Sequence, residues 1–187
     1  MNSKKALIWL PLLLLSMSIG SLALAQAGAP QRGRKGTGLV PVTDVEKATM
    51  THMREEEKLA RDVYIKMYEF WGEAIFSNIS VSEQRHMDAI LQLLVRYGVS
   101  DPASGNAVGV FSDPGLQKMY TDLVNQGQLS LLDACLVGRA IEELDIADLL
   151  KAIDETDKTD LERVYSHLLD GSYNHLRAFN FHIENLQ

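Results

Sequence analysis

The residues best suited to do chemistry are Glu83 and His86, a Glu-x-x-His pair inside a predicted amphipathic helix. Residues three apart lie on the same side of a helix, about 60° apart at roughly 100° per residue. Apolar residues from Ile79 to Tyr97 recur at three- and four-residue spacing, and Glu83 and His86 fall on the stripe that they form. A carboxylate and an imidazole on a buried face cost several kcal/mol unless they are paired or bind a metal ion. The pair therefore predicts partners elsewhere in the chain.

Two long helices are predicted in the first half of the folded domain. The first begins at Thr43 or Asp44, either of which can cap it, and ends near Trp71. Residues 76–78 are predicted to connect it to the second helix, which carries the Glu-x-x-His pair and ends at Gly98.

The first predicted helix carries Glu57 on its apolar stripe. Glu55 is expected to point away from this stripe, and Glu56 lies at its border. Glu57 could equally form a surface ion pair with Arg61, one turn further on. Tyr64 lies on the same stripe, where it fits as packing or as a phenol that hydrogen-bonds a nearby site.

Two further long helices are predicted after a crossover. Residues 101–115 predict a loop, and residues 116–125 a short helix that belongs to the crossover rather than to a bundle. The third long helix is expected at 130–156, with a serine cap, and the fourth at 159–184. Asp170-Gly171 is expected to kink the fourth helix or to divide it in two.

Both of these helices also carry ionisable residues on their apolar sides. Glu142 lies near the middle of the apolar face of the third helix, whereas Glu143 is displaced to the side, so the periodicity favours Glu142. Asp145 lies near the other margin of that face. His175 is centred on the stripe of the fourth helix. Glu142 could instead bond Arg139 on the same helix, without a metal ion.

Four long helices therefore each present at least one ionisable group inward, and four such groups at comparable positions suggest that they meet. The inward groups are Glu57, Glu83, His86, Glu142 and His175. Carboxylates and imidazoles that meet in a dry core need a cation, and this donor set suits iron or manganese, with zinc also compatible. Di-iron carboxylate bundles use one Glu from each of two helices and a Glu-x-x-His from each of the other two.

These residues also carry a family resemblance. The segment from Glu57 to Tyr64 (Glu-Lys-Leu-Ala-Arg-Asp-Val-Tyr) resembles the E-x-x-A-R-x-x-Y stretch of rubrerythrin-type ferritin-like proteins, in which the Glu is a metal ligand. The stretch from Glu55 to Phe179 resembles the uncharacterised ferritin-like family DUF2202. Besides the first segment, its recognisable pieces are Ser82-Glu-Gln-Arg-His-Met-Asp, Ile141-Glu-Glu-Leu-Asp-Ile-Ala-Asp-Leu and Ser172-Tyr-Asn-His-Leu-Arg-Ala-Phe.

The resemblance implies an all-α fold: a ferritin-like antiparallel four-helix bundle with a long crossover that contains a short extra helix. It also implies a metal site. One residue departs from the dinuclear pattern, because Ser172 stands where a Glu is expected three residues before His175. Asp145, one turn from Glu142, is the candidate replacement for that charge. The site is thus expected to bind one or two ions of iron or manganese per chain through Glu57, Glu83, His86, Glu142, His175 and Asp145.

Three functions fit this sequence. The first is a ferritin-like oxidoreductase whose metal reacts with oxygen or peroxide and which takes electrons from an external donor, since one cysteine cannot form a rubredoxin-like domain. The second is a non-catalytic bundle that binds or stores metal, or binds a partner, in the cell envelope. The third is a metal-free bundle whose buried Glu–His pairs fix the helix register. A homo-oligomer is compatible with each of them.

The N-terminus resembles a secretory signal peptide. Lys4 and Lys5 precede an apolar run, and small residues end in Ala23-Leu24-Ala25, a cleavage signal. Cleavage after Ala25 (signal peptide 1–25) would leave a Gly- and Pro-rich flexible leader at 26–42 and a helical domain at 43–187. The protein is expected to be secreted or periplasmic, with no stable membrane span after cleavage; an uncleaved membrane anchor is the alternative.

Composition and the absence of known motifs narrow the classes of function that the protein can have. The formal net charge is −7, and loss of the signal peptide would remove Lys4 and Lys5 and make the protein more acidic. Such an acidic protein is not expected to bind nucleic acid. Cys135 is the only cysteine, so no internal disulfide can form, and we expect it to be a small buried residue rather than a reactive thiol. No nucleophile elbow, P-loop or dinucleotide fingerprint occurs in the sequence.

Overall fold

The computed structural model describes residues 40–187, which form five α-helices joined by turns and loops. The helices are α1 (Asp44–Trp71), α2 (Ala74–Tyr97), α3 (Pro114–Gly127), α4 (Leu131–Asp154) and α5 (Thr159–Leu186). The predicted all-α class is confirmed. The predicted signal peptide at 1–25 and the leader as far as residue 39 lie outside the described residues. In residues 40–187, no helix is both long enough and apolar enough to cross a membrane.

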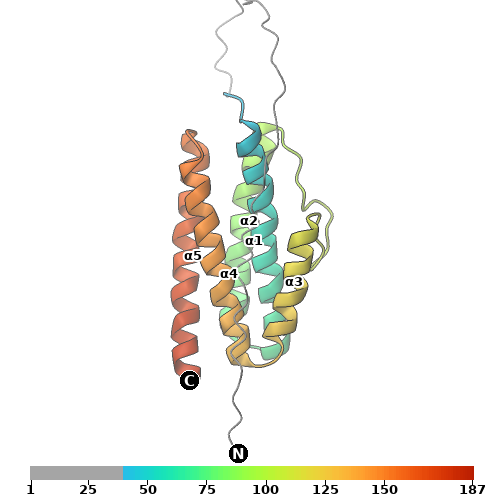
Figure 1. The fold of residues 1–187 in the computed structure, drawn as a ribbon, viewed down its shortest axis with the longest axis vertical. Helices are drawn as coiled ribbons and strands as arrows, with labels where there is room; N and C mark the ends of the chain where they lie inside the picture. The colour runs from blue at the N-terminus through green and yellow to red at the C-terminus, as the bar shows by residue number, and fades with distance from the viewer. Residues whose placement is uncertain (1–39) are drawn as a thin grey trace, which may run out of the picture. The chain divides into compact units, whose positions relative to one another are not determined.

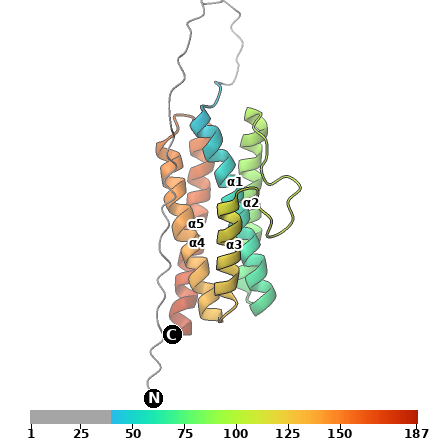
Figure 2. The same ribbon diagram turned by 45° about the vertical axis from the view of Figure 1, so that its right-hand side comes forward.

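The four long helices pack as two antiparallel pairs. α1 packs against α2, and α4 packs against α5; α1 also contacts α4, and α2 contacts α5, so the four helices enclose a common core (Figures 1 and 2). α3 lies outside this core, against α1 and α4. It brings the chain back along the bundle before α4 begins, so that α2 and α4 run in the same direction (Figure 1). This is the short crossover helix that the sequence predicted.

The connection between α1 and α2 is shorter than predicted. Gly72 has φ +67°, a left-handed conformation that ends α1 and that glycine adopts without a Cβ penalty. Only Gly72 and Glu73 separate the two helices, so the expectation of a connection at 76–78 is wrong. Phe76 lies inside α2 and is fully buried, with its ring 6.0 Å from that of Phe179. Burial of this aromatic ring stabilises the helical turn that local sequence alone did not predict.

Of the two outcomes predicted at Asp170-Gly171, the division of the fourth helix is wrong, whereas the kink stays a prediction. α5 is a single helix from Thr159 to Leu186. A glycine inside a helix costs about 1 kcal/mol relative to alanine but does not by itself end the helix. The position of Gly171 has a packing reason that belongs to the candidate site.

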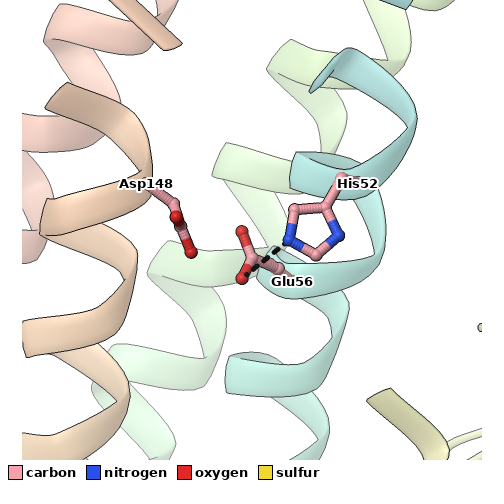
Figure 3. Close-up of side chains that lie close together, drawn as sticks. All are labelled: His52, Glu56 and Asp148. Carbon is pink, nitrogen blue, oxygen red and sulfur yellow. Dashed lines mark ion pairs between the residues drawn. The ribbon is translucent and has the colours of Figure 1, made fainter. Parts of the chain in front are cut away.

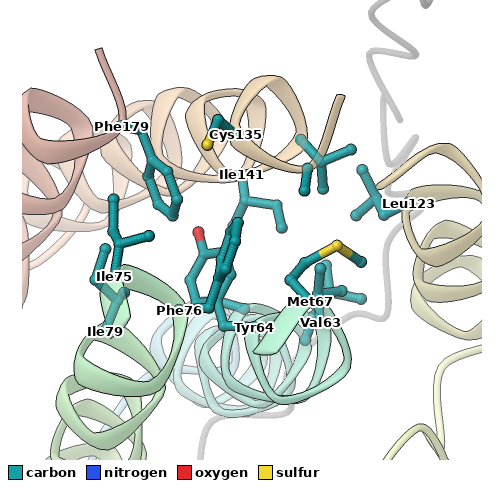
Figure 4. Packing of buried hydrophobic residues seen from close by; sticks show 14 of the residues in the cluster. Val63, Tyr64, Met67, Ile75, Phe76, Ile79, Leu123, Cys135, Ile141 and Phe179 are labelled. Carbon is teal, nitrogen blue, oxygen red and sulfur yellow. The ribbon is translucent and has the colours of Figure 1, made fainter. Parts of the chain in front are cut away.

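The bundle core contains two apolar clusters, one toward each end. The first includes Phe76, Cys135 and Phe179 (Figure 4), and the second includes Met53, Ile90 and Leu149, among others. Along each long helix, the predicted site residues fall between members of these two clusters; Glu83, for example, lies between Ile79 and Ile90. The site is therefore a polar layer enclosed by apolar packing at both ends. The burial of Cys135 was predicted, and burial raises the pKa of its thiol to about 11.

Charged residues of α1 bind the crossover that precedes α3. Glu55 accepts hydrogen bonds from the backbone N–H groups of Ser112 (2.5 Å) and Asp113 (3.2 Å). Lys58 donates to the carbonyl of Ala107 (2.8 Å) and pairs with Asp62. Glu55 faces away from the bundle interior, as predicted, but the crossover buries it. These contacts hold the long connection against the outer face of α1.

Candidate metal centre

The four long helices bring together five of the predicted ligands. α1 supplies Glu57, α2 supplies Glu83 and His86, α4 supplies Glu142, and α5 supplies His175. All five are buried, with at most 8% of each residue exposed. We call these five residues the polar layer. The predicted inward orientation of Glu142 rather than Glu143 is confirmed, because Glu142 is 1% exposed and the Glu143 side chain is 59% exposed.

Glu83 lies at the middle of the polar layer. One of its carboxylate oxygens, Oε2, is 2.7 Å from Nδ1 of His86, and the other, Oε1, is 2.8 Å from Nδ1 of His175. Nδ1 of His86 is also 3.2 Å from Glu57, and Nδ1 of His175 is 3.4 Å from Glu142. The layer thus contains two triads that share Glu83, and within each triad the donor atoms lie within 4.8 Å of one another.

Several of these short distances are not hydrogen bonds. Nδ1 of His175 has no hydrogen-bond partner among the described residues, although two carboxylates lie within 3.4 Å of it. Oε1 of Glu57 and Oε1 of Glu83 are likewise buried without a partner in the described part of the chain. Buried polar atoms are nearly always satisfied in native proteins, so such a group of exceptions needs an explanation. A cation coordinated between the donor atoms would satisfy all of them.

Tyr64 belongs to the site as well as to the core. Its hydroxyl donates to Oε1 of Glu142 at 2.5 Å, and its ring centroid lies 5.3 Å from that of Phe179. The hydrogen bond fixes one oxygen of Glu142 and leaves Oε2 directed at His175. Burial, followed by the charge of Glu142, raises the pKa of the phenol well above its ordinary value, so Tyr64 acts as a donor.

Asp145 lies beside the two triads but is not a member of either. Its Oδ2 accepts a hydrogen bond from the hydroxyl of Ser172 at 2.5 Å, while its Oδ1 is buried and has no partner in residues 40–187. Burial and the charges of Glu57 and Glu142 raise its pKa well above the ordinary value. Ser172, which stands in place of the expected Glu, thus hydrogen-bonds a carboxylate that α4 supplies.

Gly171 makes room for one of the histidines. A Cβ on this residue would lie 2.6 Å from Nε2 and 2.7 Å from Cε1 of His86, closer than real Cβ contacts. The absence of a side chain on α5 therefore lets the His86 ring lie against this helix. The ring is also stacked on that of His175, with 5.6 Å between centroids and 27° between planes.

The charges of the polar layer depend on one another. Burial raises the pKa of Glu57 to about 8, and burial with the charge of Glu83 raises that of Glu142 to about 7. Burial opposes ionisation of Glu83, but its contacts with His175 and His86 outweigh this effect and lower its pKa to about 2. Burial also opposes protonation of the imidazoles, yet the surrounding carboxylates raise the pKa of His86 to about 11 and of His175 to about 9.

The raised pKa values of Glu57 and of both imidazoles favour protons within the layer, which offset the charge of the buried carboxylates. Metal ions bind deprotonated carboxylates and neutral imidazoles, so a bound cation would take the place of those protons. Carboxylate oxygens and imidazole nitrogens in a closed layer are a donor set that fits iron or manganese. The buried Glu and His groups could therefore hold metal ions.

Arg61 and Arg139, which could have paired with Glu57 and Glu142 in place of a metal ion, contact other residues. Arg61 does not pair with Glu57: it forms hydrogen bonds with Asp62 and Gln84. Arg139 is nearest to the exposed Glu143, at 3.9 Å. In the described residues, no arginine or lysine forms an ion pair with Glu57 or Glu142.

A second group of potential ligands was missed by the sequence analysis. His52, Glu56 and Asp148 place donor atoms within 4.8 Å of one another. The apolar periodicity assigns no role to His52, and it places Asp148 on the polar edge of its helix. The four-residue spacing of His52 and Glu56, which puts both on one side of α1, was the available signal.

Comparison with known proteins gives a family and a homologue. The family model described as "Uncharacterized protein domain (DUF2202)" matches residues 46–186. "Uncharacterized protein MJ0754" of Methanocaldococcus jannaschii is 50% identical over 139 residues, which make up 74% of this chain and 75% of that protein. The matched range includes all five residues of the polar layer, Asp145 and Ser172.

Two solved structures resemble this chain. The crystal structure of hypothetical protein MJ0754 from Methanococcus jannaschii matches with a TM-score of 0.78 and 47% identity, over 81% of this chain and 87% of that chain. The crystal structure of a DUF305 fragment from Deinococcus radiodurans matches with a TM-score of 0.58 and 17% identity, over 78% and 99% of the two chains. At that identity the second match shows a shared fold and nothing about function.

Proposed function

This chain belongs to the DUF2202 family, and we propose that it is an exported ferritin-like protein whose bundle core binds one or two ions of iron or manganese. The observation that carries the proposal is the position of Glu83. Its two carboxylate oxygens face Nδ1 atoms of His86 and His175, and each imidazole faces a further carboxylate. Glu83 would thus be able to contribute to two cation-binding donor sets, one with His86 and one with His175.

The ligand pattern supports the ferritin-like assignment. Di-metal carboxylate bundles take single Glu ligands from two helices, and here α1 gives Glu57 and α4 gives Glu142. The other two helices should each give a Glu-x-x-His. α2 does so, while α5 gives His175 with Ser172 three residues before it. The Ser172 hydroxyl holds the carboxylate of Asp145, which we propose as the replacement for the missing Glu.

The residues of the polar layer would have separate roles. Glu57 and His86 would hold one ion, Glu142 and His175 the other, and Glu83 would contact both. A bound iron or manganese ion supplies one-electron redox chemistry and Lewis acidity, and oxygen or peroxide is the proposed co-substrate. Tyr64 keeps Glu142 in place by its hydrogen bond, and the two apolar clusters limit the access of water to the layer. Electrons would come from an external donor.

The test is the metal content of protein purified without chelators, together with a Glu83→Gln variant. We expect about one or two iron or manganese ions per chain in the wild type, and loss of this metal in Glu83→Gln. Glu143→Gln, which makes the same change at an exposed position of α4, should retain the metal. Wild-type protein that contains no metal and takes up neither ion when offered would contradict the proposal and favour the metal-free bundle.

A second measurement separates redox chemistry from storage. Protein loaded with ferrous ion is exposed to peroxide or oxygen, and the formation of ferric ion is followed by absorbance. Oxidation that is faster in the wild type than in Glu83→Gln supports the redox function. Binding of ferrous ion without accelerated oxidation would instead support a metal-binding or storage protein in the cell envelope.

A further inference from the structure

A second group of metal-binding side chains lies between α1 and α4, outside the polar layer. It consists of His52 and Glu56 on α1 and Asp148 on α4, and we call it the outer cluster (Figure 3). Nε2 of His52 is 3.2 Å from Oε1 of Glu56, and the carboxylate of Asp148 faces that of Glu56 from the neighbouring helix (Figure 3). One ligand atom from each residue lies within 4.8 Å of the other two.

Glu56 is the residue that requires a further partner. Only 6% of this residue is exposed, and its Oε2 is buried with no hydrogen-bond partner in the described part of the chain. In residues 40–187, neither Glu56 nor Asp148 forms an ion pair with a lysine or an arginine. Two carboxylates therefore face each other with a single imidazole beside them. A cation bound among the three side chains would satisfy Oε2 of Glu56 and reduce the repulsion between the carboxylates.

The outer cluster lies between solvent and the polar layer. The His52 side chain is 43% exposed, so an ion can reach it from solution. Glu56 directly precedes the proposed ligand Glu57, and Asp148 follows Asp145 by three residues, about one turn along α4. Asp145 in turn follows the proposed ligand Glu142 by three residues on the same helix. On both α1 and α4, the outer cluster therefore lies within about one helical turn of the proposed inner ligands.

We propose that His52, Glu56 and Asp148 form a second divalent-cation site, at the surface of the bundle, from which ions pass inward to the polar layer. One imidazole and two carboxylates suit manganese, ferrous or zinc ions and leave coordination positions for water. Retained water makes the ion exchangeable, as an entry site requires. The existence of the outer site is independent of the function proposed above, whereas its role in entry rests on that function.

The first experiment measures binding at equilibrium with Mn²⁺ alone as the probe. The full chain is titrated, and free Mn²⁺ is counted by its electron paramagnetic resonance signal. His52→Gln and Asp148→Asn should each bind one fewer ion per chain than the wild type, and Glu143→Gln, a matched change at an exposed position of α4, should bind the same number as the wild type. Equal binding by the wild type and Asp148→Asn would overturn the outer site and leave an ordinary His52–Glu56 ion pair.

A double variant separates the outer site from the polar layer. In Glu83→Gln the central ligand is lost, so Mn²⁺ that this variant still binds belongs to the outer site, and adding Asp148→Asn should abolish it. If instead Glu83→Gln has no effect and Asp148→Asn still removes an ion, the proposed function fails while the outer site stands. Circular dichroism of each variant checks that the helices are intact, so that loss of binding cannot be assigned to unfolding.

The entry role is tested by rate. Rapid mixing of metal-free protein with Mn²⁺ should show the centre filling at least about tenfold more slowly in Asp148→Asn than in the wild type, because a carboxylate at the entrance concentrates the cation. Glu143→Gln should fill at the wild-type rate. Equal rates for Asp148→Asn and the wild type would overturn the entry role without affecting the outer site.

Discussion

At the scale of single residues, the site depends on which atoms face one another rather than on how many acids are present. The α1 segment 55–57 contains three consecutive glutamates with three different environments. Glu55 binds backbone N–H groups of the crossover, Glu56 faces the gap between α1 and α4, and Glu57 faces the bundle interior. Successive helical residues are rotated by about 100°, so identical neighbours necessarily meet different partners. Only the third of them belongs to the polar layer.

Gly171 provides a residue-scale prediction about the shape of the site. Gly171→Ala would place a Cβ 2.6 Å from Nε2 of His86, so the imidazole must move away from α5. Because helical alanine is favoured over glycine by about 1 kcal/mol, the substitution should cost little stability, or even raise it, while it displaces a ligand. We expect Mn²⁺ affinity at the centre to fall at least about tenfold, as it does when groups that orient a ligand are changed. The measurement is Mn²⁺ titration alongside thermal unfolding.

Asn174→Ala is the matched control for this prediction. It also raises helix propensity on α5, but it lies on the exposed side of the helix. Within residues 40–187, its amide bonds only the carbonyl of Asp170 and the side chain of Arg177. Its Mn²⁺ affinity should equal that of the wild type. Retention of full affinity by Gly171→Ala would show that the position of the His86 ring is not required for binding.

At the scale of helices and connections, sequence periodicity predicted most of what positions the site. The caps at Thr43 and Ser130 begin α1 and α4 as expected, and the inward directions of Glu57, Glu83 and Glu142 follow from the spacing of apolar residues. These features can be predicted locally, because each depends on how the apolar stripe of a single helix faces the core. A single amphipathic stripe is then enough to orient a side chain.

The predictions failed where a second packing partner decides the outcome. The sequence predicts that Phe76 lies in a connection, but its packing against the ring of Phe179 on α5 favours its place in α2. Gly171 predicts a kink or a division of the last helix, yet α5 continues through this glycine, which accommodates His86. The periodicity places Asp148 on a polar edge, yet α4 packs against α1, α3 and α5, so its margins also face neighbouring helices. Contacts between helices distant in sequence are not encoded in the periodicity of either one.

Glu46 gives a prediction about how the elements are joined. Its carboxylate accepts a hydrogen bond from the backbone N–H of Thr43 (2.7 Å), which closes the cap of α1, and another from the hydroxyl of Thr156 between α4 and α5 (2.7 Å). Burial raises the pKa of Glu46, but the contacts with Thr43 and Thr156 outweigh it, so the pKa lies below the ordinary 4.5. A lowered folded-state pKa means that the unfolded chain binds the proton more readily. The stability from this group is therefore present above pH 4.5 and is lost as the pH falls through the folded-state pKa.

Glu46→Gln should remove this part of the pH dependence. At pH 7 the variant should be less stable by about 1 kcal/mol, the usual cost of weakening a helix cap. Its free energy of unfolding should fall less steeply than that of the wild type below pH 4.5, as measured by urea denaturation at a series of pH values. Glu162→Gln changes an exposed acid in the first turn of α5 and serves as the control. Parallel pH profiles for the wild type and Glu46→Gln would refute a role of the ionised carboxylate.

At the scale of the whole molecule, the bundle encloses a charged layer between two apolar clusters. Buried charges that lack a cation destabilise the folded state, and an apolar layer of similar volume is often more stable. A bundle selected only for stability would therefore have filled this layer with apolar residues. The charged layer is physically reasonable if a ligand binds there. Binding to the native state alone stabilises it, and this offsets the cost of burying the charges.

Metal binding should accordingly stabilise the entire bundle, since the ligands come from all four long helices. At a free Mn²⁺ concentration one hundred times the dissociation constant, binding to the folded state adds about 2.7 kcal/mol. For a domain of this size that corresponds to a rise of roughly 5–10 °C in the unfolding temperature. Differential scanning calorimetry of metal-free protein with and without Mn²⁺ measures this rise, and removal of the metal with a chelator should reverse it. Glu83→Gln should lose the part of the rise that comes from the polar layer, because its central ligand is missing, whereas Glu143→Gln should show all of the rise. An unfolding temperature of the wild type that does not respond to Mn²⁺ would mean that the charged layer is stabilised by its own protons, and its histidines and carboxylates would then serve only to fix how the four helices pack.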